Sequence, residues 1–223
     1  MPKFEGRFVS IVLLGKHNPQ ILNHDFLVRN SILPSEDQPF RDFLAKEEGE
    51  QFSQFISTPP MTTISYGPVS IVVDEGRYQI ADRRFPEPSG TTVVDITKRY
   101  FGKCLCYTPF TAGGINFNGR LHFQMSDDEA GFDRRLGLDR ERLSELAQTE
   151  DVRVGTTISF PCLDGSVEVQ VAKPKLRPEP ATLNFNYEFG YTGDMDSFLA
   201  NLDSIAAIYG RLMRLLDDLG VER

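Results

Sequence analysis

Polar side chains recur at every second position in two segments of the chain, residues 115–124 and 183–189. This period of two is typical of a β-strand that buries one face. The polar residues of the first segment are Asn116, Asn118, Arg120, His122 and Gln124, and those of the second are Asn184, Asn186 and Glu188. Amides donate and accept hydrogen bonds, and an imidazole can also exchange a proton near neutral pH.

If the two strands are neighbours, their polar sides form one face that we expect to bind a polar ligand or a peptide. The alternative is a solvated face without a ligand, which antiparallel sheets commonly have. The binding hypothesis predicts that Asn116→Ala or His122→Ala abolishes ligand binding while the melting temperature stays nearly unchanged.

Standard catalytic signatures are absent from the sequence. It contains no Walker loop, no dinucleotide-binding glycine triad after a strand, no nucleophile elbow and no zincin helix. We therefore expect a non-enzymatic binding or assembly protein that has a protein partner or forms a homo-oligomer. The alternative is an enzyme or sensor for a small polar metabolite, in which His122 works with Glu188 or Asn116. A deep pocket beside His122 would favour that alternative.

Metal ligands are sparse in the sequence. Cys104 and Cys106 lack the second ligand pair that a structural zinc site needs, because Cys162 and His122 supply it poorly. The acidic stretch 127–129 offers oxygen ligands, but a metal-dependent nuclease would need further converging carboxylates. We predict neither a metal nor a cofactor.

Composition restricts the class of protein further. The 223 residues carry a net charge of −8, which disfavours binding to nucleic acid phosphates. Three cysteines are too few for a disulfide framework and fit a reducing cytoplasm. No apolar run approaches the roughly 20 residues that span a bilayer, and the first residues lack the apolar core of a signal peptide. We expect a cytoplasmic protein without a membrane segment.

The first half of the chain is expected to be mainly strands. An apolar run from Phe8 to Leu14 predicts a central strand that is covered on both faces. Asn23 is expected to cap a short helix. Further strands are expected at about 61–66, 69–74 and 77–82, and a helix at about 90–104.

In the second half, an acidic loop is expected at 126–131 and a helix at about 139–147. Alternation from Val152 to Phe160 and from Val167 to Val171 predicts two strands, with a hairpin turn at Asp164-Gly165.

The last helix is expected to start near Asp194 or Asp196 and to end at Gly220. Its apolar residues are spaced 4-3-4-3 along a narrow seam. The helix seam consists of Phe198, Leu202, Ile205, Tyr209, Leu212, Leu216 and Leu219. A helix that lies across the sheet is one interpretation; the other is an interface with a partner, formed by the residues from Phe198 to Leu216.

These elements predict a single composite α+β domain over residues 1–223, with possible halves at 1–125 and 132–223. Its core is a large, mostly antiparallel sheet with helices on one face and a long C-terminal helix. Short matches such as Asn116-Phe117-Asn118 and Asn184-Phe185-Asn186 are too irregularly placed to define a sequence repeat.

The chain resembles an uncharacterised family of bacterial proteins of about this length, which has no assigned activity. The resemblance rests on the opening strand, on Asn18-Pro19-Gln20-Ile21 with Phe26-Leu27, and on Tyr107-Thr108-Pro109 followed by Gly113-Gly114-Ile115-Asn116. It also uses Leu121-His122-Phe123 and the late strand with Asn184 and Asn186. More distantly, the chain is similar to a sporadically distributed bacterial family whose last strand leads into a long C-terminal helix. The resemblance implies a shared fold and no particular activity.

Overall fold

The protein forms one large antiparallel sheet with helices packed on one side. The computed structural model describes residues 1–33, 53–58, 60–85, 87–124, 126–138, 142, 145, 155–172, 180–190 and 194–222. Its strands are β1 (Lys3–Gly15), β2 (Ser53–Thr58), β3 (Met61–Tyr66), β4 (Val69–Asp74), β5 (Arg77–Asp82), β6 (Phe110–His122), β7 (Thr156–Cys162), β8 (Gly165–Ala172) and β9 (Ala181–Phe189). Its helices are η1 (Pro19–Ile21), α1 (His24–Arg29), η2 (Pro88–Gly90), α3 (Val93–Cys104), α4 (Ser126–Arg135), α6 (Met195–Asn201), η3 (Leu202–Ser204) and α7 (Ile205–Asp218).

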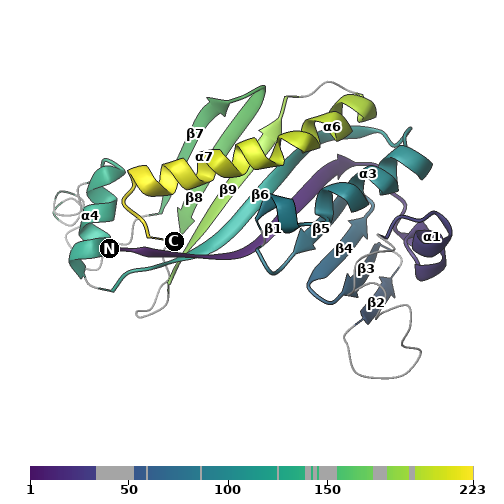
Figure 1. The fold of residues 1–223 in the computed structure, drawn as a ribbon, viewed down its shortest axis with the longest axis horizontal. Helices are drawn as coiled ribbons and strands as arrows, with labels where there is room; N and C mark the ends of the chain where they lie inside the picture. Colours follow the sequence, from purple (N-terminus) through teal and green to yellow (C-terminus); the bar gives the residue numbers. More distant parts are fainter. Residues whose placement is uncertain are drawn as a thin grey trace.

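The nine strands follow the order β2-β3-β4-β5-β1-β6-β9-β8-β7, and every neighbouring pair is antiparallel (Figure 1). The predicted α+β class is confirmed, as is the long helical segment near the C-terminus. None of the helices within the described ranges has the length and apolar character needed to cross a bilayer.

The topology repeats itself around the centre of the sheet. In each half a long strand, β1 or β6, is followed by a short helix, then by strands that return to lie beside it, and finally by a helix on the sheet. β5 lies next to β1 as β9 lies next to β6, and β4 and β8 follow outward. Because β1 pairs with β6 over almost its whole length, both halves share one continuous sheet.

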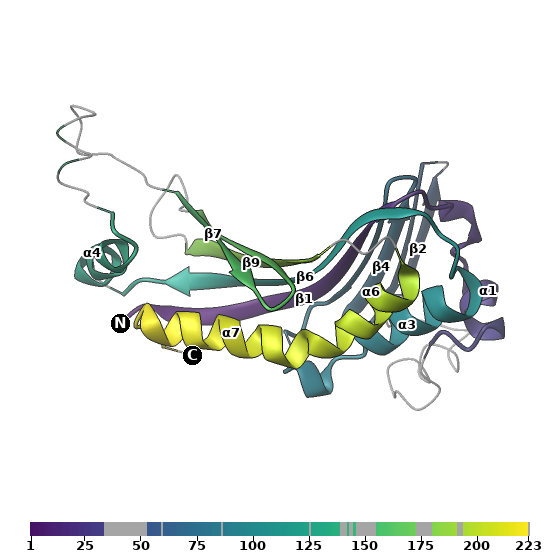
Figure 2. The ribbon, with the colours of Figure 1, turned by 90° about the horizontal axis from the view of Figure 1, so that it is seen from above.

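The helices α3, α6 and α7 lie along one face of this sheet, and α4 lies beyond the end of β6. Figure 2 shows α3, α6 and α7 on one side, while the outer strands at both ends of the sheet bend toward the other side. Val9, Ile11 and Leu13 of β1 point toward the helices and are buried. On the opposite face Val12 is only partly buried and Leu14 is 41% exposed. The prediction that this strand is covered on both faces was therefore wrong, because an apolar run does not by itself reveal which layers cover it.

Two glycines allow aromatic rings to pack where β1 bulges. Gly6 pairs with Gly119 of β6, and the register shifts between Gly6 and Phe8. A Cβ atom at Gly6 would overlap the ring of Phe85, and one at Gly119 would overlap the ring of Phe4. These rings meet edge to face with centroids 5.7 Å apart. The two glycines thus let the N-terminal end of β1 pack closely against Phe4 and Phe85 of the core.

The C-terminal helical segment follows the sheet through its apolar seam. Asp194, one of the two residues near which the helix was expected to start, caps the first turn by accepting hydrogen bonds from the backbone N–H groups of Asp196 and Ser197. Phe198 packs against Phe110 and Phe189, with ring centroids 5.6 and 5.7 Å apart. The buried seam residues are Phe198, Leu202, Ile205, Leu212, Leu216 and Leu219, and Tyr209 is partly buried. The seam is occupied by the chain's own sheet, which removes it from the surfaces that a partner can contact.

One expected loop is a helix. Residues 126–131 belong to α4, in which Phe132 is fully buried and packs against Phe123 with ring centroids 5.5 Å apart. This contact stabilises a helix that its acidic composition does not suggest. The helix expected at about 139–147 lies outside the described residues except for positions 142 and 145, and the start of the expected strand at 152–154 also lies outside them. The three strands expected between residues 61 and 82 are confirmed residue for residue.

The burial of the seam predicts the response of the helix to truncation. Leu212 of α7 is fully buried, so Leu212→Ala leaves a cavity and is expected to lower the free energy of unfolding by about 2–5 kcal/mol. The adjacent Arg211 is exposed, and Arg211→Ala is the matched control with a change within about 0.5 kcal/mol. Urea denaturation measures both values. Equal stabilities for the two variants would contradict the packing of this helix on the sheet.

Candidate functional site

Four asparagines meet on the face of the sheet that lies opposite the helices. Asn116 of β6 pairs with Asn186 of β9, and Asn118 pairs with Asn184 in the next alternate position. The side-chain amide of Asn118 donates a hydrogen bond to Oδ1 of Asn184. The condition on which the binding hypothesis depends, that the two alternating strands are neighbours, is met. We refer to these four residues as the asparagine cluster.

Polar residues continue the cluster across β8 to β7. Asn186 pairs with Glu168, which pairs with Ser159, and Asn184 pairs with Gln170. Gln170 donates its side-chain amide to Glu168 at 2.6 Å. These neighbours add the amide of Gln170, the hydroxyl of Ser159 and the carboxylate of Glu168 to the asparagines on this half of the sheet face. Glu168 and Gln170 were part of the expected alternation in this strand, but their place beside the asparagines follows from the strand order.

Ser10 of β1 extends the same row on the other side. It pairs with Asn116 and with Ala81 of β5, so its side chain lies on the helix-free face. The residue is fully buried, and its hydroxyl has no hydrogen-bond partner in the described part of the chain. A buried hydroxyl without a partner costs free energy. Sequence reasoning missed Ser10 because it lies within an apolar run and has no signal of its own.

His122 lies at the end of β6, away from the asparagine cluster. Its Nε2 donates a hydrogen bond to Oε2 of Glu5 at 2.8 Å, and the two side chains are 44% and 46% exposed. This hydrogen bond is the main cause that holds the pKa of Glu5 below its ordinary value of 4.5. Glu5 was missed as a partner because it is 117 positions from His122 in the sequence.

The register separates His122 from the residues that the enzyme alternative requires. Glu188 pairs with Gly114, eight positions before His122 on β6, which corresponds to about 26 Å along a strand. Asn116 is six positions away, or about 20 Å. The expectation that His122 works with Glu188 or Asn116 is therefore wrong, because alternation places residues on one face without placing them side by side.

Opposite charges lie at the two ends of the asparagine cluster. Arg120 is exposed beyond Asn118 and pairs with Glu5 on one side and Thr182 on the other. Glu188 is exposed beyond Asn186 at the other end. Six positions of β6 separate Arg120 from the residue opposite Glu188. The asparagine cluster thus lies between Arg120 at one end and Glu188 at the other, with Glu168 on the strand beside Asn186.

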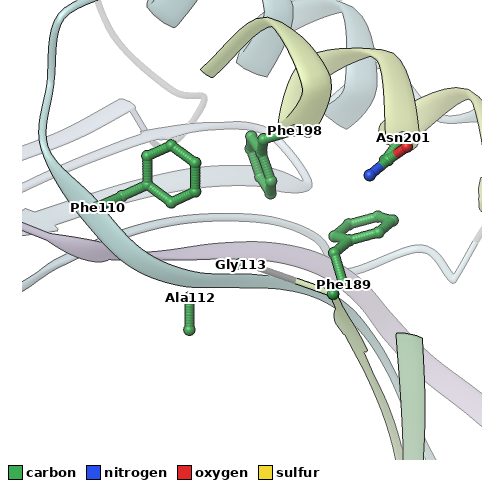
Figure 3. Close-up of a pocket in the computed structure, with 7 residues that line it drawn as sticks. Phe110, Ala112, Gly113, Phe189, Phe198 and Asn201 are labelled. Atoms are coloured by element: carbon green, nitrogen blue, oxygen red, sulfur yellow. The ribbon is translucent and has the colours of Figure 1, made fainter. Parts of the chain in front are cut away.

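A small hollow lies at the end of the sheet where α6 begins (Figure 3). It is lined by Phe110, Ala112, Gly113, Phe189, Gly190, Phe198 and Asn201. The enclosed space holds about one water molecule, which is far below the several hundred Å³ of a typical small-molecule site. It is lined by three aromatic rings and has no ionisable group, so it offers no acid–base chemistry.

Metal ligands do not gather among the described residues: no group of three or more histidine, cysteine, aspartate or glutamate side chains is placed to hold an ion there. The side chains of Cys104 and Asp127 lie outside this description. Asp128 forms an ion pair with the N-terminal amine, with the nitrogen 3.1 Å from Oδ1. Glu129 is buried in α4. These two carboxylates therefore belong to the packing of α4 near the N-terminus.

The Glu5–His122 pair predicts a specific titration. His122→Ala removes the strongest cause of the lowered pKa and is expected to raise the pKa of Glu5 toward 4.5, whereas Arg7→Ala removes a weaker charge effect and is expected to raise it less. Because the folded-state pKa is lowered, the stability from this pair is present above about pH 4.5 and is lost as the pH falls through the folded-state value. NMR titration of the Glu5 carboxyl carbon in the unaltered protein and in the two variants measures the three pKa values. A larger shift in Arg7→Ala would contradict the hydrogen bond as the main cause.

A scan of protein-family models found no match to this chain, and a search of curated proteins likewise found none. The family resemblance noted in the sequence stays a prediction. Function therefore has to be inferred from the chemistry of the helix-free sheet face, where the asparagine cluster brings together the largest group of residues expected to bind a ligand.

Proposed function

We propose that this chain is a non-enzymatic binding protein whose helix-free sheet face receives a polar, largely uncharged ligand or a protein partner at the asparagine cluster. The observation that carries the proposal is the pairing of Asn116 with Asn186 and of Asn118 with Asn184 on adjacent strands. Four amides in one group present donors and acceptors together, which suits a ligand that also has both.

The state of these amides supports a binding role. In the described part of the chain, the side chains of Asn116 and Asn186 form no hydrogen bond with one another or with other residues. Both side chains are only partly exposed, so a ligand displaces little water from them. Each amide can then gain a hydrogen bond to the ligand. The neighbouring hydroxyl of Ser10 is buried and has no hydrogen-bond partner among the residues that the structure describes. Hydrogen-bonding capacity is thus concentrated at the centre of the sheet.

The chemistry of the face favours binding over catalysis. The imidazole of His122 and the carboxylate of Glu5 lie on an open surface, where water competes for both groups. Enzymes usually hold acid–base groups in concave sites that exclude water. An enzyme or sensor that uses His122 would have Glu5 as the carboxylate beside the imidazole, in place of the expected Glu188 or Asn116. We therefore retain the enzyme or sensor only as the second candidate.

The partner of the proposed module is a protein or a second copy of the chain. Contact through the helix seam would require the C-terminal helical segment of α6, η3 and α7 to leave the sheet, because five of the six proposed interface residues are buried there. The sheet face is therefore the proposed contact. The acidic balance of the chain and its three cysteines favour a cytoplasmic protein that does not bind nucleic acid.

A panel of three ligand classes tests the proposed function. The ¹⁵N-labelled protein is titrated with an uncharged hexapeptide, with maltohexaose and with a single-stranded hexanucleotide, and the side-chain amide resonances of the four asparagines are followed by NMR. We expect one of the first two to shift these resonances and the nucleotide to leave them unchanged, because Glu168 and Glu188 repel phosphates.

Matched variants locate the binding. Asn116→Ala combined with Asn186→Ala is expected to weaken binding at least about tenfold while leaving the melting temperature within a few degrees. Thr63→Ala lies on the same face in β3, on the opposite half of the sheet, and is expected to bind as the unaltered protein does. Binding that is equally strong in all three proteins, or no shift with any member of the panel, would refute the proposed site.

A further inference from the structure

We propose that the ligand of the asparagine cluster is an extended peptide segment that lies along β6 and β9, with its amino end over Glu188 and its carboxyl end over Arg120. This inference rests on the proposed function and adds the chemical class, orientation and length of the ligand. It follows from the spacing of the amides, from the charges at the two ends of the cluster and from the hydrogen-bonding groups that remain available.

The spacing of the amides matches the repeat of an extended peptide. Asn116 and Asn118 are two residues apart on one strand, a distance of about 6.7 Å between equivalent atoms. An extended peptide above the sheet also repeats after two residues, so the same face of its backbone recurs at each asparagine. Each side-chain amide carries a donor and an acceptor, as a peptide unit does. Asn184 and Asn186 repeat the spacing on β9, about 4.8 Å to the side.

The hydrogen bond within the cluster leaves complementary groups for such a backbone. Because Asn118 donates one N–H to Oδ1 of Asn184, the acceptor Oδ1 of Asn118 and the donor Nδ2 of Asn184 keep their full hydrogen-bonding capacity. The amides of Asn116 and Asn186 keep both groups, as far as the described residues show. The cluster therefore recognises N–H and C=O groups without requiring particular side chains.

The charges at the ends complement the charges of a short peptide. Glu188 is exposed at one end and Glu168 lies on the next strand, so this end attracts an amino group. Arg120 is exposed at the other end, and Lys3 is exposed on β1 opposite His122. Glu5 lies between these two cations, and it is already engaged by His122 and Arg7. The positive side chains therefore favour a carboxylate at this end.

The distance between the ends sets the length of the segment. Six strand positions separate Arg120 from the residue opposite Glu188, or about 20 Å. An extended peptide covers this distance with about six residues. A hexapeptide with free ends can thus place its two charges over the two ends of the cluster. A neutral oligosaccharide could use the amides but would gain nothing from Arg120 and Glu188.

The probe is the hexapeptide Ser-Ala-Thr-Ala-Thr-Ala with free termini, compared with the same peptide acetylated and amidated. We expect the free peptide to shift the side-chain amide resonances of all four asparagines with a dissociation constant of about 1 mM or lower, and blocking both ends to weaken binding about threefold to tenfold. Asn116→Ala is expected to weaken it about tenfold, and Thr63→Ala not at all.

A charge exchange tests the orientation. Glu188→Lys alone is expected to weaken binding of the free peptide, and adding Arg120→Glu is expected to restore it with the peptide reversed. A spin label on the side chain of a cysteine near the amino end, with both termini left free, reports the direction, because it should broaden resonances near residue 188 in the unaltered protein and near residue 120 in the double variant. Unchanged direction in the double variant would overturn the proposed orientation.

The outcomes separate this inference from the proposed function. If maltohexaose shifts the four asparagine resonances and the peptide does not, the face is a binding site but the peptide assignment is wrong. Equal affinity of the free and blocked peptides would overturn the role of Arg120 and Glu188. If neither ligand shifts these resonances, the proposed function fails together with the peptide.

Discussion

The pairing of β1 with β6 is the interaction on which the rest of the structure depends. Both strands have 13 residues, and they join the two halves of the chain into one sheet. Every other strand is added outward from this pair. The pairing also sets the two faces of the sheet, because it directs Val9, Ile11 and Phe117 toward the helices and Ser10 and Asn116 away from them. A slip by one residue would exchange the two faces.

Coverage on one side follows from where the helices attach. α3 and the C-terminal helical segment each follow the last strand of their half and pack on the same side of the sheet. Their apolar residues pack against the strand side chains that face the helices, and together they form a single core. The other face can therefore hold amides and hydroxyls at low cost, since water reaches most of them. Three small residues of one row on it, Ser10, Ser70 and Ala81, are nevertheless buried.

Local patterns predicted the elements well where turns and periodicity agree. The strands between residues 61 and 82 match because the alternation and the turn signals coincide, and the cap at Asp194 follows from side-chain chemistry alone. α4 was missed because Phe132 is buried by a tertiary contact with Phe123. Alternation predicted that the asparagines of each strand share a face, whereas the pairing of the two strands with one another was left open. Which residue lies opposite which depends on the register, and register placed His122 beside Glu5 and far from Glu188.

The two halves of the chain carry different side chains at equivalent positions of the repeated topology. Ala81 occupies in the first half the place that Asn186 occupies in the second, because each lies on the strand next to the central pair and in the row of Ser10 and Asn116. One step further out, Ser70 stands where the other half has Glu168. In this row, small side chains occupy the first half of the chain and longer polar ones the second. Equivalent positions of the repeated topology thus carry side chains of different size and hydrogen-bonding capacity, so the exposed face is chemically asymmetric although the strand order repeats.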